Sequence, residues 1–188
     1  MPQVKNKKKK SSIIQVSIGV LAVILAILII IMMGIVSDIQ GTARIVNYTG
    51  LVRGETQRLI KLELSTQQEN EMIHEIRTFI DGLRNGNDEL NLVRLDDVDF
   101  QNKMQELDDK FSDLYKKIYL VRFKGVKNTD IIPESEEFFV ICDEATGLAE
   151  KYSQKKATSL SLLEKYITAD IVVLMLLIGY EFIKAIQY

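Results

Sequence analysis

Residues 42–64, TARIVNYTGLVRGETQRLIKLEL, form the stretch around which the chain is organised. No proline interrupts it or the apolar segment before it, so we expect one helix to run through both. Each glycine inside a helix costs about 1 kcal/mol relative to alanine. The glycines therefore either allow another helix to approach closely or belong to a site where arginines and an amide meet a small anion. At 100° per residue, one sector of this helix carries Asn47, Gly50, Gly54, Gln57, Arg58 and Lys61, with Arg53 at its edge.

The segment before this stretch has the composition of a membrane anchor. Residues 13–36 contain no charged side chain, and about 20 apolar residues in a helix span a bilayer. Residues 1–12 form a basic tail with five lysines, which the positive-inside rule places in the cytoplasm. The sequence MMGIVSDIQG offers no small-x-small cleavage site, so we predict an uncleaved transmembrane helix over 13–36.

Residues 166–183 are the second predicted transmembrane helix. Its centre, residues 171–180, is apolar, and the full length includes Asp170 and Glu181. The alternative is a buried amphipathic helix. Residues 184–188, with Lys184, then begin a cytoplasmic segment, and residues 37–165 lie outside the cytoplasm.

The region between the spans predicts helices. We expect the first helix to continue to about Leu83 and to end in the turn residues DGLRNGND. Residues 87–96 form a connection, and Asp96 or Asp97 is the N-cap of a second helix that ends near Phe123. The second helix has a heptad seam: Phe100, Met104, Leu107, Phe111, Leu114, Ile118 and Val121.

A third helix is predicted to begin around residues 133–135 and to lead into the second span. Gly147 marks a possible bend, and the polar run at 152–158 leaves open whether residues 134–183 form one helix or two. Three helices of this length need a fourth partner, from a turn or from a second subunit. We therefore predict an all-α protein whose two transmembrane helices continue into a four-helix-bundle-like domain, completed in a parallel homodimer. The seam of the third helix comprises Phe138, Cys142, Ala145, Ala149 and Tyr152, then Leu160, Leu163 and Ile167.

The sequence contains no recognisable catalytic constellation, so we expect no enzyme, no cofactor and no metal site. His74 is the only histidine and is expected on a surface or half-buried helix position. Cys142 is the only cysteine, which excludes an internal disulfide and predicts a small buried apolar side chain. Acidic residues outnumber basic ones by six over 37–165, which argues against a nucleic-acid partner.

Residues 46–59, VNYTGLVRGETQRL, resemble the signature helix of the nitrate/nitrite sensor histidine kinases and of the related input domain of type IV pilus chemoreceptors. The sequence departs from the nitrate sensors at Gly54 and Glu55, where they carry larger neutral residues. The rest of the chain resembles the extracytoplasmic input domain of membrane-bound diguanylate cyclases with a C-terminal GGDEF module. The positions that match the signature helix are Asn47, Gly50, Arg53, Thr56, Arg58 and Leu59.

This resemblance implies a signal-sensing input module that binds a small ligand, such as an anion, and moves a cytoplasmic output domain beyond this chain. Arg53 would contact the anion, Asn47 and Arg58 would be further contacts or dimer-interface groups, and Gly50 and Gln57 would share their sector. Two copies would meet across a dimer axis. The alternative is a non-sensory, membrane-anchored structural protein in which Arg53 is an ion-pair residue. The basic residues of this helix would then pair with Glu55, Glu63 or lipid headgroups; they are Arg44, Arg53, Arg58 and Lys61.

Overall fold

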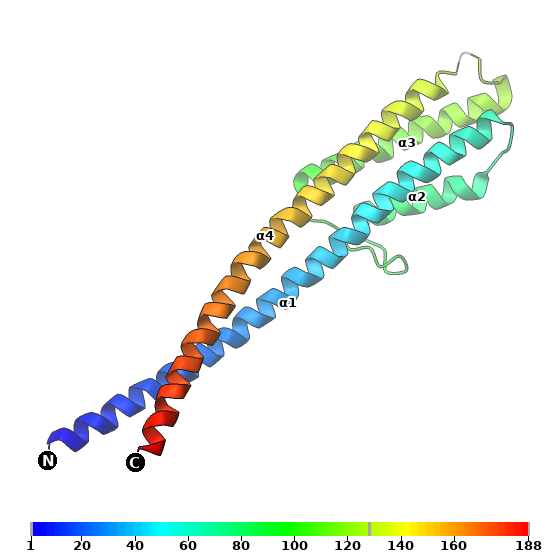
Figure 1. Cartoon of the computed structure of the whole chain (residues 1–188). Coiled ribbons are helices and arrows are strands. Elements are labelled where there is room, and N and C mark those ends of the chain that lie inside the picture. Colours follow the sequence, from blue (N-terminus) through cyan, green and yellow to red (C-terminus); the bar gives the residue numbers. More distant parts are fainter. Residues whose placement is uncertain (1, 128, 188) are drawn as a thin grey trace. The chain divides into compact units, whose positions relative to one another are not determined.

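The computed structural model describes residues 2–127 and 129–187, with side chains from Ser12 onward. Within these residues the secondary structure is helical, which confirms the predicted all-α class. Contacts divide the chain into a core unit, residues 38–155, and an apolar unit that contains residues 12–37 and 156–187. The helices, labelled in Figure 1, are α1 (Pro2–Leu64), α2 (Asn70–Asn85), α3 (Val98–Lys124) and α4 (Ile131–Ile186).

The apolar unit contains two helical stretches that are long and apolar enough to cross a membrane, one in α1 and one in α4. Their large apolar side chains are exposed: Ile30, Met175 and Leu176 are each 69% accessible. Such exposure is costly in water and costs nothing in hydrocarbon. The alternative of a buried amphipathic helix at 166–183 does not fit, because only 11% of its most apolar window is buried.

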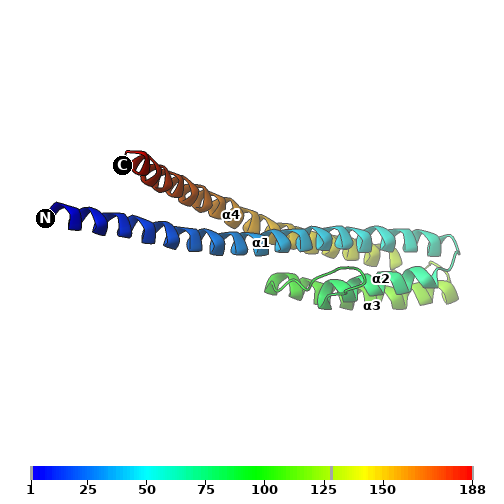
Figure 2. The same cartoon turned by 90° about the horizontal axis from the view of Figure 1, so that it is seen from below.

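In the core unit, segments of all four helices lie side by side in both views of the ribbon (Figures 1 and 2) and share one apolar core. The predicted seam of α3 is confirmed, since all seven of its positions from Phe100 to Val121 are buried. The predicted N-cap is confirmed at Asp97, whose Oδ1 accepts a hydrogen bond of 3.1 Å from the backbone N–H of Phe100. Gly125, with a φ of 76°, follows the end of the helix.

The prediction that the first helix reaches Leu83 is wrong, because α1 ends at Leu64. The polar residues 65–69 form a tight reversal in which Thr66 adopts a φ of 63°. The reversal returns a second amphipathic helix to the core, so the fourth helical segment comes from the same chain. A parallel homodimer stays a prediction. The buried positions of α2 are Met72, Ile73, Ile76, Ile80, Gly82 and Leu83.

The chain of α4 answers the question that the sequence left open. It forms one continuous helix, begins at Ile131, and shows no break at Gly147 or in the polar run that follows. Phe138, Cys142, Ala145 and Ala149 of its predicted seam are buried, and the small residues bring α4 close to the core. An unbroken α4 joins the core unit to the second apolar stretch along one helix.

The connection between α2 and α3 packs against α1. Gly86, with a φ of 86°, ends α2, and the backbone groups of Asn87 and Leu92 then exchange two hydrogen bonds of 2.8 Å. The close approach depends on Gly41 of α1, where a Cβ would lie 2.8 Å from Cγ2 of Val93. The predicted connection at 87–96 is thus present, and it packs against α1.

Candidate functional site

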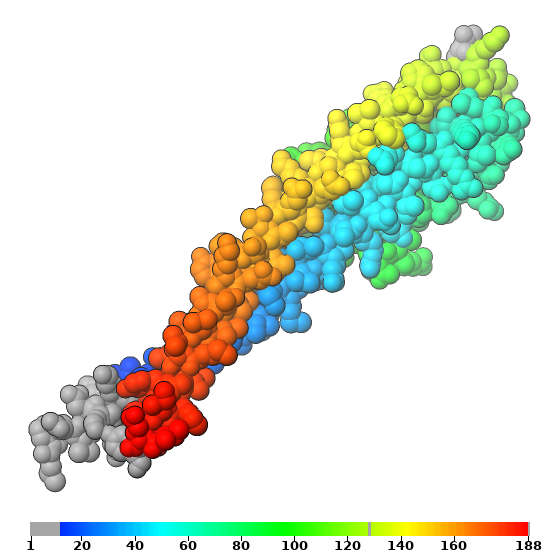
Figure 3. All heavy atoms as spheres, viewed as in Figure 1, coloured from blue at the N-terminus to red at the C-terminus, as the bar shows by residue number. Residues whose placement is uncertain are grey.

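The residues predicted as a ligand site lie along one exposed side of α1. Asn47, Gly54, Gln57 and Arg58 are exposed and Gly50 is half-buried. A Cβ at either Gly50 or Gly54 would meet no atom within 4 Å, so these glycines serve no close contact inside this chain. Figure 3 views the face of the core unit where atoms of α1 and α4 (cyan and yellow) are not covered by α2 and α3.

Arg53 lies at the border between α1 and α4. Its Nη1 donates a hydrogen bond to Oδ1 of Asp143 in an ion pair, and its Cζ lies 5.1 Å from the ring centroid of Phe139. The two charged side chains are 39% and 47% exposed. Arg53 is therefore an ion-pair residue, as the structural alternative expects, and its partner is Asp143 on α4.

The remaining predicted contacts are looser. Arg58 Nη1 lies 3.5 Å from Oε2 of Glu55, one turn earlier on the same helix. Exposed ion pairs contribute about 0–1 kcal/mol, because water screens both charges. An oxyanion that offers two oxygens to a guanidinium can therefore replace a carboxylate partner such as Asp143 at little cost.

The opposite side of α1 escaped the sequence analysis. Two rows with a seven-residue spacing are buried there: Ile45, Val52 and Leu59 in one, and Thr42, Thr49, Thr56 and Glu63 in the other. The hydroxyls of Thr42 and Thr49 donate to carbonyls of their own helix, which satisfies them inside the core. The signal that could have revealed this face is the heptad spacing of threonines beside β-branched and leucine side chains.

Glu63 ends the threonine row and holds three helices together. Its carboxylate accepts hydrogen bonds from Nε and Nη2 of Arg122 on α3, the first of 2.8 Å. It also accepts the backbone N–H of Glu69 before α2, and Arg122 Nη1 donates to Oδ1 of Asn70 at 2.7 Å. The side chains of Glu63 and Arg122 are only 1% and 8% exposed, so this pair is a buried ionic link.

Cys142 is buried as predicted. Burial raises the pKa of its thiol to about 12, although the charge of Arg53 acts in the opposite direction. The part of the chain that the structure describes holds no group of three or more histidine, cysteine or acidic side chains that could bind a metal ion.

We expect Cys142 to resist thiol reagents in the folded chain, because the reactive thiolate is scarce far below its pKa. A disulfide reagent such as Ellman's reagent at about pH 8 should modify the chain only after unfolding in denaturant. Because the folded pKa lies above the unfolded value of 9.0, stability from this thiol is constant below pH 9 and falls as the pH rises toward 12. Cys142→Ala should lack the loss of stability between pH 9 and 12 that the thiol causes. Rapid modification of the folded chain by the reagent would contradict the burial of Cys142.

His74 is exposed on α2, in agreement with the prediction of a surface position. It lies beside Arg77 and two tyrosines of α3 around a hollow that the sequence analysis did not anticipate. His74 and Tyr115 are 41 positions apart in the chain, and no local pattern indicates that they meet.

Comparison with protein-family models, with curated proteins and with solved structures gives no match for this chain.

Proposed function

We propose that this chain is the input module of a transmembrane sensor. The observation that carries the proposal is the continuity of α1 and α4, each of which contains an apolar stretch of membrane-spanning length and a segment of the core. A helix transmits an axial or rotational shift of about 1–2 Å along its length with little loss. A ligand that prefers one arrangement of α1 and α4 would thereby act on the other side of the membrane.

In this proposal residues 37–165 are extracytoplasmic and both termini are cytoplasmic, as the basic tail favours. The ligand is a small anion that takes the place of Asp143 at Arg53 and so releases one contact between α1 and α4. Asn47, Gly50, Gln57 and Arg58 extend the surface on which the anion and a second copy of the chain would lie in a parallel homodimer. The output is a cytoplasmic domain of the diguanylate cyclase class, as the resemblance of the sequence implies.

The experiment is thermal unfolding of the full chain in lipid nanodiscs, followed by circular dichroism, against a panel of nitrate, nitrite and other small oxyanions with chloride as reference. We expect one oxyanion to raise the Tm. At a hundredfold excess over its Kd, bound ligand adds about 2.7 kcal/mol to the free energy of unfolding. Without anion, Arg53→Ala should change the free energy of unfolding by no more than about 1 kcal/mol. It should lose the rise in Tm that the anion causes in the wild type.

Lys116→Ala is the matched control, because it also removes one exposed, ion-paired cation but lies on α3. It should keep the full anion-induced shift. If no oxyanion raises the Tm of the wild-type chain, or if Arg53→Ala keeps the shift, the anion site on α1 is wrong.

The alternative function is a non-sensory, membrane-anchored helical accessory protein. The observation that favours it is that Arg53 already has a carboxylate partner and a ring contact inside the chain. In that case the Arg53–Asp143 pair is only a packing contact, and the panel of oxyanions leaves the Tm unchanged.

A further inference from the structure

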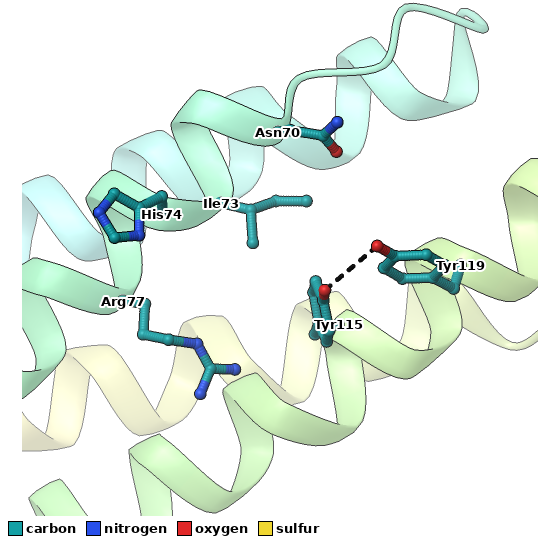
Figure 4. Close-up of a pocket in the computed structure, with 6 residues that line it drawn as sticks. All are labelled: Asn70, Ile73, His74, Arg77, Tyr115 and Tyr119. Atoms are coloured by element: carbon teal, nitrogen blue, oxygen red, sulfur yellow. Dashed lines mark hydrogen bonds between the residues drawn. The ribbon is translucent and has the colours of Figure 1, made fainter.

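A hollow of about 440 Å³ lies between α2 and α3 (Figure 4). We call it the α2–α3 groove; its volume lies within the range of about 300–1,000 Å³ that is typical of small-molecule sites. Ile73 supplies an apolar wall, and the rings of Tyr115 and Tyr119 meet edge to face with centroids 5.0 Å apart. It is lined by Asn70, Ile73, His74, Arg77, Tyr115 and Tyr119.

Arg77 differs from every other arginine of the described chain in having neither a hydrogen bond nor an ion pair. Its only specific contacts are with rings: its Cζ lies 5.6 Å from the centroid of Phe111 and 5.7 Å from that of Tyr115. A guanidinium held over ring faces keeps its five N–H donors for another partner. The other six donate to carboxylate, amide or carbonyl oxygens: Arg44, Arg53, Arg58, Arg84, Arg94 and Arg122.

The tyrosine hydroxyls add neutral donors to the same groove. Tyr115 donates its hydroxyl proton to the oxygen of Tyr119 at 3.3 Å, which leaves the proton of Tyr119 for a ligand. That contact also raises the pKa of Tyr115, so the hydroxyl of Tyr115 stays protonated at neutral pH. The imidazole of His74 also lines the groove and forms no hydrogen bond with the described residues. At the other end, the amide oxygen of Asn70 accepts from Arg122.

The acidic side chains near Arg77 decide how much negative charge the groove can accept. Asp81 and Asp108 line the adjoining hollow, but Asp81 accepts from Asn85 and Asp108 is ion-paired with Arg84. Glu71 and Glu75 line the surface on the other side of His74. One unpaired guanidinium amid these four carboxylates suits a single negative charge and disfavours phosphates and dicarboxylates.

We propose that the α2–α3 groove binds a small organic monocarboxylate, whose carboxylate pairs with Arg77 and whose apolar body lies against Ile73 and the tyrosine rings. The hydroxyl of Tyr119 donates to the same carboxylate or to a polar substituent of the ligand. The site is complete within one chain and depends neither on Arg53 nor on a second subunit.

Benzoate is the probe, because it combines one carboxylate with a planar apolar body, and benzamide is its neutral counterpart. Isothermal titration of the full chain in lipid nanodiscs, with empty nanodiscs as blank, should show saturable binding of benzoate and none of benzamide. Arg77→Met keeps an unbranched apolar chain over Phe111 and removes the charge. It should weaken benzoate binding at least about tenfold, as the loss of a charge-assisted hydrogen-bond pair does.

Two further variants separate this site from a structural role for Arg77 and from the anion site on α1. Tyr119→Phe should weaken benzoate binding about threefold to tenfold, through the loss of one neutral hydrogen bond. Arg53→Ala should leave benzoate binding unchanged. If benzoate, phenylacetate and isobutyrate all fail to bind the wild-type chain saturably, or if Arg77→Met binds benzoate as tightly as the wild type, the assignment of the groove is wrong.

Discussion

Replacing Glu63 with alanine lowers the free energy of unfolding of the core unit by about 3–5 kcal/mol, the usual cost of removing one partner from a buried ion pair. The carboxylate is 1% exposed and accepts hydrogen bonds from two nitrogens of Arg122. Without it, the guanidinium of Arg122 stays in a dry site with only Asn70 as a hydrogen-bond partner. Chemical denaturation of the full chain in detergent micelles, followed by circular dichroism, measures the loss.

Two controls separate burial from charge in this result. Glu55→Ala removes a carboxylate whose partner Arg58 is 65% exposed, and it should cost less than about 1 kcal/mol. The double variant Glu63→Leu/Arg122→Leu removes both buried charges and should recover most of the stability, since paired apolar side chains replace such ion pairs at little cost. A loss below about 1 kcal/mol for Glu63→Ala would show that the pair is solvated and not buried.

Replacing Phe111 with alanine lowers the free energy of unfolding by about 3–5 kcal/mol, because it leaves a cavity in the middle of the α3 seam. The ring is fully buried, and its centroid lies 5.8 Å from that of Phe138 on α4. The same ring supports Arg77, so this variant should also weaken benzoate binding. Denaturation in detergent and titration in nanodiscs measure the two effects on one protein.

Phe123→Ala is the matched control, because it makes the same change on the same helix at a position where the ring is 82% exposed. It should change stability by no more than about 0.5 kcal/mol. Equal losses for the two variants would contradict the position of the α3 seam.

The seam of α3 and its N-cap could be predicted because both depend on residues close in sequence. Seven large apolar side chains recur with heptad spacing, and a capping aspartate acts on a backbone N–H three residues later. The two apolar stretches were equally evident, since length and the lack of charge decide whether a helix can cross a membrane. In each case the physical cause lies within one helix.

The end of α1 could not be predicted from the same kind of pattern. Helix propensity alone permits residues 65–69 to continue a helix, and the reversal there is favoured by what it brings together. It returns α2 to the core and places Glu63 beside Arg122, 59 residues away in the chain. The turn is therefore stabilised by tertiary contacts, namely the burial of α2 and the pairing of Glu63 with Arg122.

The candidate sites divide in the same way. Sequence alone placed Asn47, Gly50, Arg53, Gln57 and Arg58 along one side of one helix, and the structure keeps them there. Only the tertiary structure gave Arg53 its partner on α4, because an ion pair 90 residues apart has no local signature. Only the packing of α2 on α3 placed two tyrosines beside Arg77, which forms no ion pair with a carboxylate of the described chain.

The sequence by itself determined the helical class, the two apolar stretches and the buried face of α3, since periodicity and hydropathy act through neighbours one or two turns apart. The tertiary structure decided where α1 ends, which of its faces is buried, and which charged groups meet. Those outcomes depend on side chains far apart in sequence, whose burial and pairing energies exist only once the helices have packed.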